Sequence, residues 1–296
     1  MSDPTKVTIV TRTKDRPVFL ERALNDCLNQ SFTDFEMVIV NDGGDPAPID
    51  ELLRKYDKQF HGRARVIHNP ESLGMEKASN VAIESSDGKY ICIHDDDDTW
   101  APSFLQTCTG YLEANPEAGG VAVRTEMVLE RIAGDKLIEI GRLPAWPEVH
   151  QFSLSMLLEN NIAVPISCMY PRVVIKDLGG FRSDLPVVGD WEFHLRLAAK
   201  YDVGFIDGKP LAFWHQRRSQ KGVLGNSTFA AAEKHAYFDL QIRDEYLKDY
   251  VAHNGIGALL WQAAMLKQAR TTGPETAFSF AKKKYYKLRG LLERKK

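Results

Sequence analysis

The sequence predicts an α/β protein with a mostly parallel sheet flanked by helices, a mixed second half and a helical C-terminal extension. Between residues 6 and 100, short β-branched runs alternate with helical patterns over short connections. This alternation favours parallel strands joined by crossover helices. A hairpin pattern interrupts the alternation after residue 120, and from Thr228 onward the residues are mostly helix formers.

The first half is expected to contain four strands, over residues 6–11, 36–40, 64–68 and 90–94. Helices are expected between them, from Pro17 to near Gln30 and over residues 49–56 and 77–85. The first of these begins at a proline, which suits the first turn of a helix. Because parallel sheets bind ligands beyond the carboxyl ends of their strands, a site is expected in the loops that follow these strands.

The second half is expected to be mixed. After a helix over residues 102–115, two runs at 121–132 and 136–141 flank a short polar turn, as the strands of a hairpin do. Breaks at Asn254-Gly255 and Gly273-Pro274 predict three helices toward the C-terminal end. The expected organisation is one domain over residues 1–222, with halves 1–100 and 101–222, and an extension over 223–296.

Composition excludes several classes of protein. The net charge of −2 gives no reason to expect a nucleic-acid partner. No apolar stretch is long enough to span a bilayer, so a cytoplasmic protein is expected. The four cysteines form no CxxC pair, which indicates buried free thiols. A phosphate-binding GxxxxGK[ST] loop and a zinc-binding HExxH motif are both absent from the sequence.

The acidic run from Asp95 to Asp98 follows the fourth predicted strand, where a ligand loop is expected. In an extended segment Asp95 and Asp97 would share one face, and Asp96 and Asp98 the other. One such pair could bind Mn²⁺ or Mg²⁺, which commonly uses only one or two protein carboxylates, and could contact a sugar hydroxyl. The alternative is a solvated acidic turn.

Several segments together resemble a known family. Residues 11–17 (TRTKDRP), 38–44 (VIVNDGG) and 90–100 (YICIHDDDDTW) resemble the nucleotide-binding half of the family 2 inverting glycosyltransferases, which have the GT-A fold. Residues 178–181 (LGGF) and 189–192 (GDWE) resemble their acceptor-side half. The resemblance implies a metal-dependent enzyme that moves a sugar from a nucleotide diphosphate donor to an acceptor hydroxyl, in surface polysaccharide or other glycan synthesis.

The resemblance also assigns residues to the donor. By position, Asp42 accepts a hydrogen bond from the base, and Arg12 and Thr13 line the same pocket. Asp95 faces the ribose or the sugar, and Asp97, on a loop expected to be exposed, binds Mn²⁺ or Mg²⁺. The nucleotide-sugar site is thus expected to include Arg12, Thr13, Asp42, Lys77, Asn80, Asp95 and Asp96. For Asp42 the alternative is a plain Asn-Asp-Gly turn.

The chain departs from the family pattern at two places. Arg12 stands where the family often has proline, and an arginine that serves the donor near Ser79 is missing. Lys77 is the candidate substitute for that arginine. Lys77 and Asn80 could instead belong to a solvated helix start.

On the acceptor side, Asp190 is the candidate catalytic base, because an inverting transfer needs a carboxylate to take the proton of the acceptor hydroxyl. It could also serve as the N-cap of a helix over residues 191–200. Trp191 and Glu192 are expected to bind the acceptor, or else to pack within the helix. His215 is a candidate metal ligand, or else a core histidine.

The expected partners are a nucleotide diphosphate-sugar donor, a UDP-sugar by preference, and a glycan or lipid-linked acceptor. The basic segment over residues 282–296 could contact an anionic membrane surface, or could be a solvated terminus. Two other functions share the expected fold. A sugar-nucleotide nucleotidyltransferase needs a Gly-rich loop with arginine and lysine after the first strand, which is missing here. A non-catalytic nucleotide-sugar-binding protein is compatible with the sequence.

Overall fold

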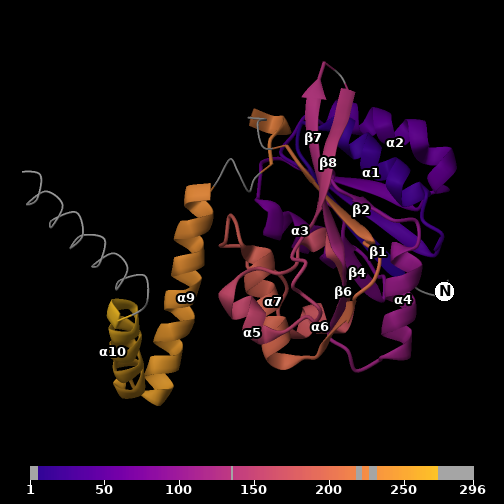
Figure 1. Cartoon of the computed structure of the whole chain (residues 1–296). Helices are drawn as coiled ribbons and strands as arrows, with labels where there is room; N and C mark the ends of the chain where they lie inside the picture. The colour runs from indigo at the N-terminus through magenta and orange to yellow at the C-terminus, as the bar shows by residue number, and fades with distance from the viewer. Residues whose placement is uncertain (1–5, 135, 218–221, 227–231, 273–296) are drawn as a thin grey trace, which may run out of the picture. The chain divides into compact units, whose positions relative to one another are not determined.

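The computed structural model describes residues 6–134, 136–217, 222–226 and 232–272 (Figure 1). Within these residues a large sheet has the strand order β10-β6-β9-β4-β1-β2-β3, and a smaller sheet has the order β5-β11-β7-β8. The strands of the large sheet are β1 (Val7–Thr13), β2 (Phe35–Asp42), β3 (Ala64–Asn69), β4 (Tyr90–Ile93), β6 (Gly120–Val123), β9 (Cys168–Pro171) and β10 (Val203–Ile206). Those of the smaller sheet are β5 (Thr99–Trp100), β7 (Thr125–Ala133), β8 (Lys136–Pro144) and β11 (Ala212–Gln216).

Helices connect and flank these strands. In the body of the protein they are α1 (Pro17–Leu28), α2 (Pro46–Phe60), α3 (Met75–Glu84), α4 (Phe104–Ala114), α5 (Leu154–Glu159), α6 (Arg172–Asp177) and α7 (Gly189–Lys200). Toward the C-terminal end they are α9 (Ala232–Asn254) and α10 (Gly257–Thr272). The third helix predicted in this region would lie beyond Gly273, outside the described residues.

The first half of the sheet is parallel, as predicted. Strand β1 pairs in parallel with both β2 and β4, and β2 pairs in parallel with β3. The carboxyl ends of these strands therefore meet at one edge of the sheet, where the loops that follow them come together. The expected α/β class is thus confirmed, and so is the position of the loops.

The second half is mixed, also as predicted, but its elements differ in detail. Strand β9 lies antiparallel between β4 and β6. The run over residues 121–132, expected as one strand, is divided between β6 in the large sheet and β7 in the small one. The division falls at Arg124, whose guanidinium forms an ion pair with Asp207. Strands β7 and β8 form the predicted antiparallel hairpin, drawn in magenta in Figure 1.

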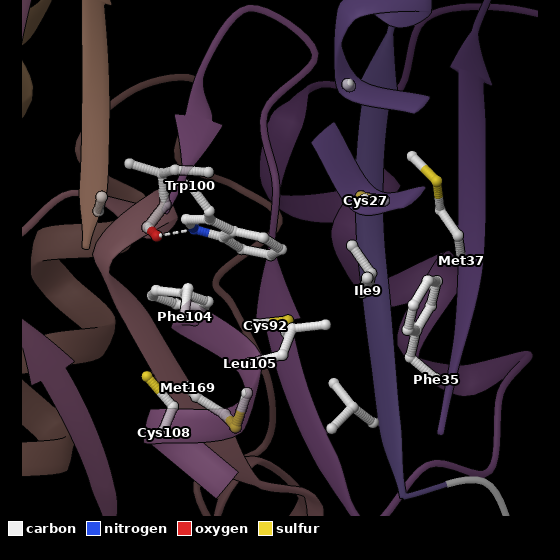
Figure 2. Close-up of a cluster of buried hydrophobic side chains, with 14 of the residues drawn as sticks. Ile9, Cys27, Phe35, Met37, Cys92, Trp100, Phe104, Leu105, Cys108 and Met169 are labelled. Carbon is white, nitrogen blue, oxygen red and sulfur yellow. Dashed lines mark hydrogen bonds between the residues drawn. The ribbon is translucent and has the colours of Figure 1, made fainter. Parts of the chain in front are cut away.

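The hydrophobic core holds the site-bearing strand ends in place. Helix α1 begins with Pro17 and buries Leu20, Leu24 and Cys27, which have the spacing of one helical face. They pack on the side of the sheet that receives Ile9 of β1, since alternate residues of a strand share a face. Figure 2 shows this cluster, in which Trp100 stacks on Phe104 and donates a hydrogen bond to the carbonyl of Ile166 over 2.6 Å.

The four cysteines are buried free thiols, as the sequence predicted, and Figure 2 shows Cys27, Cys92 and Cys108 in the core cluster. By its internal packing the chain divides into two units, residues 1–239 and 240–296, and the division falls within α9. None of the described helices combines the length and the apolar character needed to cross a bilayer.

Candidate functional site

A pocket of about 110 Å³ lies beyond the carboxyl ends of β1 and β4. Arg12 enters it from β1, Asp95 from the loop after β4, and Asp190 from the first turn of α7. These three residues, expected in the site from sequence, therefore lie around one cavity. Glu76 and Asp98 also line it.

Arg12 supplies a positive charge to this pocket. Its guanidinium forms an ion pair with Asp95, in which Nε lies 3.1 Å from Oδ1. It also donates to Ser79 Oγ over 3.3 Å and to the carbonyl of Met75 over 3.4 Å. The guanidinium that the family pattern places near Ser79 is thus supplied from β1 in this chain.

Asp190 is held in a defined orientation. Its Oδ2 accepts a hydrogen bond from Asn161 Nδ2 over 2.9 Å. Burial raises the pKa of Asp190, while the bond from Asn161 opposes this rise because it favours the ionised form. A carboxylate with a raised pKa at the wall of a pocket can accept a proton from a substrate hydroxyl.

The alternative role of Asp190 as an N-cap is wrong. Helix α7 begins two residues earlier than expected, and its N-cap is Val188, which makes no side-chain capping bond and has φ of 58°. Asp190 lies inside the first turn, where a carboxylate interacts favourably with the helix dipole. Its side chain is consequently available to the pocket.

The sequence did not indicate Glu76 as a site residue, because the helix was expected to begin at Lys77, whereas α3 begins at Met75. The side chain lies in the first turn of α3 and is buried, with 5% of its surface exposed. Burial raises its pKa to about 7, with Arg12 opposing and Asp190 reinforcing the rise. The spacing from Glu76 to Ser79 and Ile83 is that of one helical face, so the pattern could have placed Glu76 on the buried side.

The acidic run forms a turn, so the expected alternation of an extended segment is wrong. The amide of Asp98 donates to the carbonyl of Asp95 over 3.2 Å. Asp96 turns inward to Arg16, with distances of 2.6 and 3.1 Å. Asp98 accepts a hydrogen bond from the amide of His215 over 2.8 Å. The pocket therefore receives Asp95 and Asp98, which were predicted on opposite faces.

Asp97 is buried, with 8% of its surface exposed, so its expected exposure is wrong. Its Oδ2 forms an ion pair with Arg217, whose side chain is fully buried, and lies 3.6 Å from Arg16. Arg217 also pairs with Glu130 over 3.2 Å, and Arg22 pairs with Glu130 over 2.6 Å. A buried network of arginines and carboxylates therefore joins the acidic turn to the segment after β11.

The side chains present provide oxygen ligands of the kind that Mn²⁺ and Mg²⁺ prefer. Within the described residues, every hydrogen bond and ion pair of the Asp97 carboxylate is made by Oδ2, which leaves Oδ1 available to a cation. The described part of the chain contains no group of three His, Cys, Asp or Glu side chains arranged to hold a metal. Asp97 therefore fits an ion that completes its shell with water and substrate phosphate.

His215 is placed away from an open ligand position. Its Nδ1 contacts Glu130, and its Nε2 lies 2.8 Å from Thr99 Oγ1. Burial lowers its pKa, with Glu130 opposing this effect. Both ring nitrogens have protein partners, so the structure favours the alternative of a buried, hydrogen-bonded histidine.

Asp42 holds a loop together. Its carboxylate accepts hydrogen bonds from Asn69, Ser72, Leu73 and Gly74 over 2.8 to 3.0 Å. Burial would raise the pKa of Asp42, but these bonds lower it below the usual range. A nucleobase would have to displace one of them, so this arrangement favours a structural role over direct base binding.

The remaining donor-side candidates lie outside the pocket. Thr13 is buried at the end of β1, where side chains of neighbouring residues point to opposite faces, and only Arg12 faces the cavity. Lys77 is exposed on α3 and does not line this pocket. Asn80 donates to the carbonyl of Phe181 over 2.7 Å and accepts from its amide over 3.0 Å. Asn80 therefore positions a pocket-lining residue.

Trp191 and Glu192 are in the interior, so their expected role in acceptor binding is wrong for this structure. Trp191 is 2% exposed, and its indole donates to the carbonyl of Leu157 over 2.8 Å. Glu192 is 1% exposed and pairs with Arg196 one helical turn later. Neither side chain can stack on or bind a sugar without leaving its packed position.

The chain belongs to glycosyl transferase family 2, because the model of that family matches residues 8–178. An uncharacterized glycosyltransferase of Haemophilus influenzae is 24% identical over 192 residues, which are 63% of this chain and 58% of that protein. YwdF of Bacillus subtilis, also an uncharacterized glycosyltransferase, is 27% identical over 67% of this chain and 70% of its own. The chain thus spans less than two thirds of the Haemophilus relative.

Solved structures show the same fold. TarS 1–349 of S. aureus in complex with UDP-GlcNAc aligns over 85% of this chain and 75% of its own, with a TM-score of 0.60 and 17% identity. The mannosyltransferase PcManGT of Pyrobaculum calidifontis, in complex with GDP-Man and Mn²⁺, aligns over 97% of this chain and 81% of its own, with a TM-score of 0.60 and 18% identity. The similarity confirms the GT-A-like fold.

Proposed function

We propose that this chain is an inverting, metal-dependent glycosyltransferase that moves a sugar from a nucleotide diphosphate donor to an acceptor hydroxyl. The observation that carries the proposal is the pocket that joins Arg12 and Asp95 of the donor-side half to Asp190 of the acceptor-side half. These residues come from segments that resemble the two halves of a family 2 enzyme. A binding protein would have no need of a base in this position.

Asp190, Asn161 and Asp97 have different roles in the proposed transfer. Asp190 takes the proton of the acceptor hydroxyl while that oxygen attacks the anomeric carbon, and the bond to the diphosphate breaks with inversion. Asn161 keeps the carboxylate of Asp190 oriented through its hydrogen bond of 2.9 Å. Asp97 would hold Mn²⁺ or Mg²⁺ through Oδ1, and a bound divalent cation offsets the charge that develops on the departing diphosphate.

The proposed donor is a UDP-sugar, and the proposed acceptor is a glycan or a lipid-linked saccharide of a surface polysaccharide. TarS was solved with UDP-GlcNAc, and TuaG of B. subtilis, a putative teichuronic acid biosynthesis glycosyltransferase, is 30% identical over 34% of this chain and 39% of its own. These relatives support the proposal for cell-surface glycan synthesis. A cytoplasmic protein with peripheral membrane contact would suit such an acceptor.

A thermal-shift series with UDP, GDP, ADP and CDP, each with and without MnCl₂, tests nucleotide and metal binding, since a ligand of the folded state raises the apparent melting temperature. We expect UDP with Mn²⁺ to give the largest increase. Release of free sugar from the matching nucleotide-sugar then separates a transferase, which leaks donor to water, from a non-catalytic binding protein. A nucleotidyltransferase would instead respond to nucleoside triphosphates, and such a response would contradict the proposal.

A further inference from the structure

Glu76 is a buried carboxyl group to which the proposed reaction gives no role. Only 5% of its surface is exposed, and it lines the same pocket as Arg12 and Asp190. Its Oε2 makes no hydrogen bond with any described residue. Buried polar atoms without partners are rare and lower stability, so each one requires an explanation.

The neighbouring backbone is shaped around this side chain. A Cβ atom at Gly189 would lie 2.3 Å from Glu76 Cγ and 2.5 Å from Oε1, closer than such atoms can approach. Glycine at this position therefore lets Glu76 pack directly against the start of α7, next to Asp190. The first turns of α3 and α7 together hold both carboxyl groups at one wall of the pocket.

The charges around the pocket restrict what can occupy it. Carboxyl groups line it from Glu76, Asp95, Asp98 and Asp190. Among the described lining residues, Arg12 has the only permanent positive charge and is already paired with Asp95, and His235 is the only other one able to carry a positive charge. An acidic group on a substrate would meet several carboxyl groups here, whereas a neutral hydroxyl could form a hydrogen bond with one of them.

We propose that Glu76 is a sugar-binding residue whose carboxyl group forms a hydrogen bond with a hydroxyl of the donor sugar and makes the pocket select uncharged sugars over uronic acids. The proposal rests on the function proposed above. It places the donor sugar between Glu76 and Arg12, with Asp190 on the side of the acceptor.

Isothermal titration of the whole chain in MnCl₂ compares UDP with UDP-glucose and GDP with GDP-mannose, for the wild type and for Glu76→Leu and Glu76→Ala. Both substitutions remove the hydrogen bond, and leucine also fills the space. We expect each to weaken binding of the nucleotide-sugar by about tenfold and to leave binding of the nucleoside diphosphate unchanged. Glu84→Gln, on the exposed end of the same helix, is the matched control and should bind as the wild type does.

The outcomes separate the inference from the proposed function. If the Glu76 variants lose affinity equally for the nucleotide-sugar and the nucleoside diphosphate, or lose affinity for neither, the role of Glu76 is overturned and the proposed function is not affected. Failure of the wild type to bind any of the four ligands would overturn the proposed function as well. If the Glu76 variants do not fold, the selection against uronic acids is tested on the wild type alone. The wild type should bind UDP-glucose at least about tenfold more tightly than UDP-glucuronic acid. Equal affinity for the two would contradict the selection.

Discussion

The guanidinium group of Arg12 lies 3.3 Å from Ser79 Oγ, so the end of β1 places a positive charge beside the first turns of α3. The chain has no arginine on α3 itself. The positive charge next to Ser79 therefore comes from a strand and not from the helix that carries Ser79. This is possible because β1 ends and α3 begins at the same edge of the sheet, where their side chains reach a common space.

Asp190→Asn should lower turnover by about 10²-fold or more, because the amide cannot accept the proton at neutral pH. Donor and metal binding should be retained. The melting temperature should change little, since asparagine has nearly the same volume and Asp190 is not a helix cap. Turnover and melting temperature measured on one preparation test this, and an active, stable variant would show that the base is another residue.

Asn161→Ala should act on the base through its ionisation. The hydrogen bond from Asn161 favours the ionised form of Asp190, so its removal raises the pKa of Asp190 further. The base must be ionised to act, and the acidic limb of the pH profile of kcat should therefore move to higher pH. An unshifted limb with a uniformly lower kcat would indicate a purely structural effect.

Asp97→Ala should abolish transfer and also destabilise the fold. The change leaves the buried Arg217 with Glu130 as its remaining carboxylate partner, and breaking such a buried pair costs about 3 kcal/mol. Urea denaturation measures the loss. The double variant Asp97→Ala/Arg217→Met should recover much of the stability and none of the activity. A single variant with wild-type stability would argue against the buried ion pair.

Glu76→Gln should change how stability depends on pH. The pKa of Glu76 is raised to about 7 in the folded state, against an ordinary value of 4.5. The protonated side chain therefore makes its full contribution to the free energy of unfolding below about pH 4.5, and this contribution is lost as pH rises through about 7. Glutamine does not titrate. The free energy of unfolding of the variant, relative to that of the wild type, should therefore increase by roughly 3 kcal/mol between pH 4 and pH 8. Parallel denaturation curves at the two pH values, with Glu84→Gln as control, measure this difference.

Deletion of residues 282–296 tests the proposed membrane contact. This segment lies outside the described residues, so the prediction rests on its composition, in which lysine and arginine interleave with tyrosine and leucine. The shortened protein should sediment less with anionic vesicles and keep its activity on a soluble acceptor. Salt should weaken the attachment of the full chain, because exposed charges are screened over about 8 Å at physiological ionic strength. Equal sedimentation of both forms would contradict the contact.

The sequence determined the architecture and the general place of the site. Alternating strand and helix patterns over residues 6–100 indicated a parallel sheet, and the structure has it, with element ends displaced by one to a few residues. Arg12 and Asp95 follow predicted strands, where a ligand loop is expected, and the resemblance to family 2 glycosyltransferases assigned them and Asp190 to the site. Such local patterns indicate which end of a strand carries a residue, although they do not indicate which neighbours it meets.

The tertiary structure alone decided which carboxylates face the pocket. The turn at residues 95–98 sends Asp96 to Arg16 and Asp97 to Arg217, a partner 120 positions later in the chain. Glu76 is a pocket residue because Gly189, on another helix, leaves room for it. Burial and ion pairing depend on side chains brought together from distant segments, and no local pattern of residues encodes those encounters.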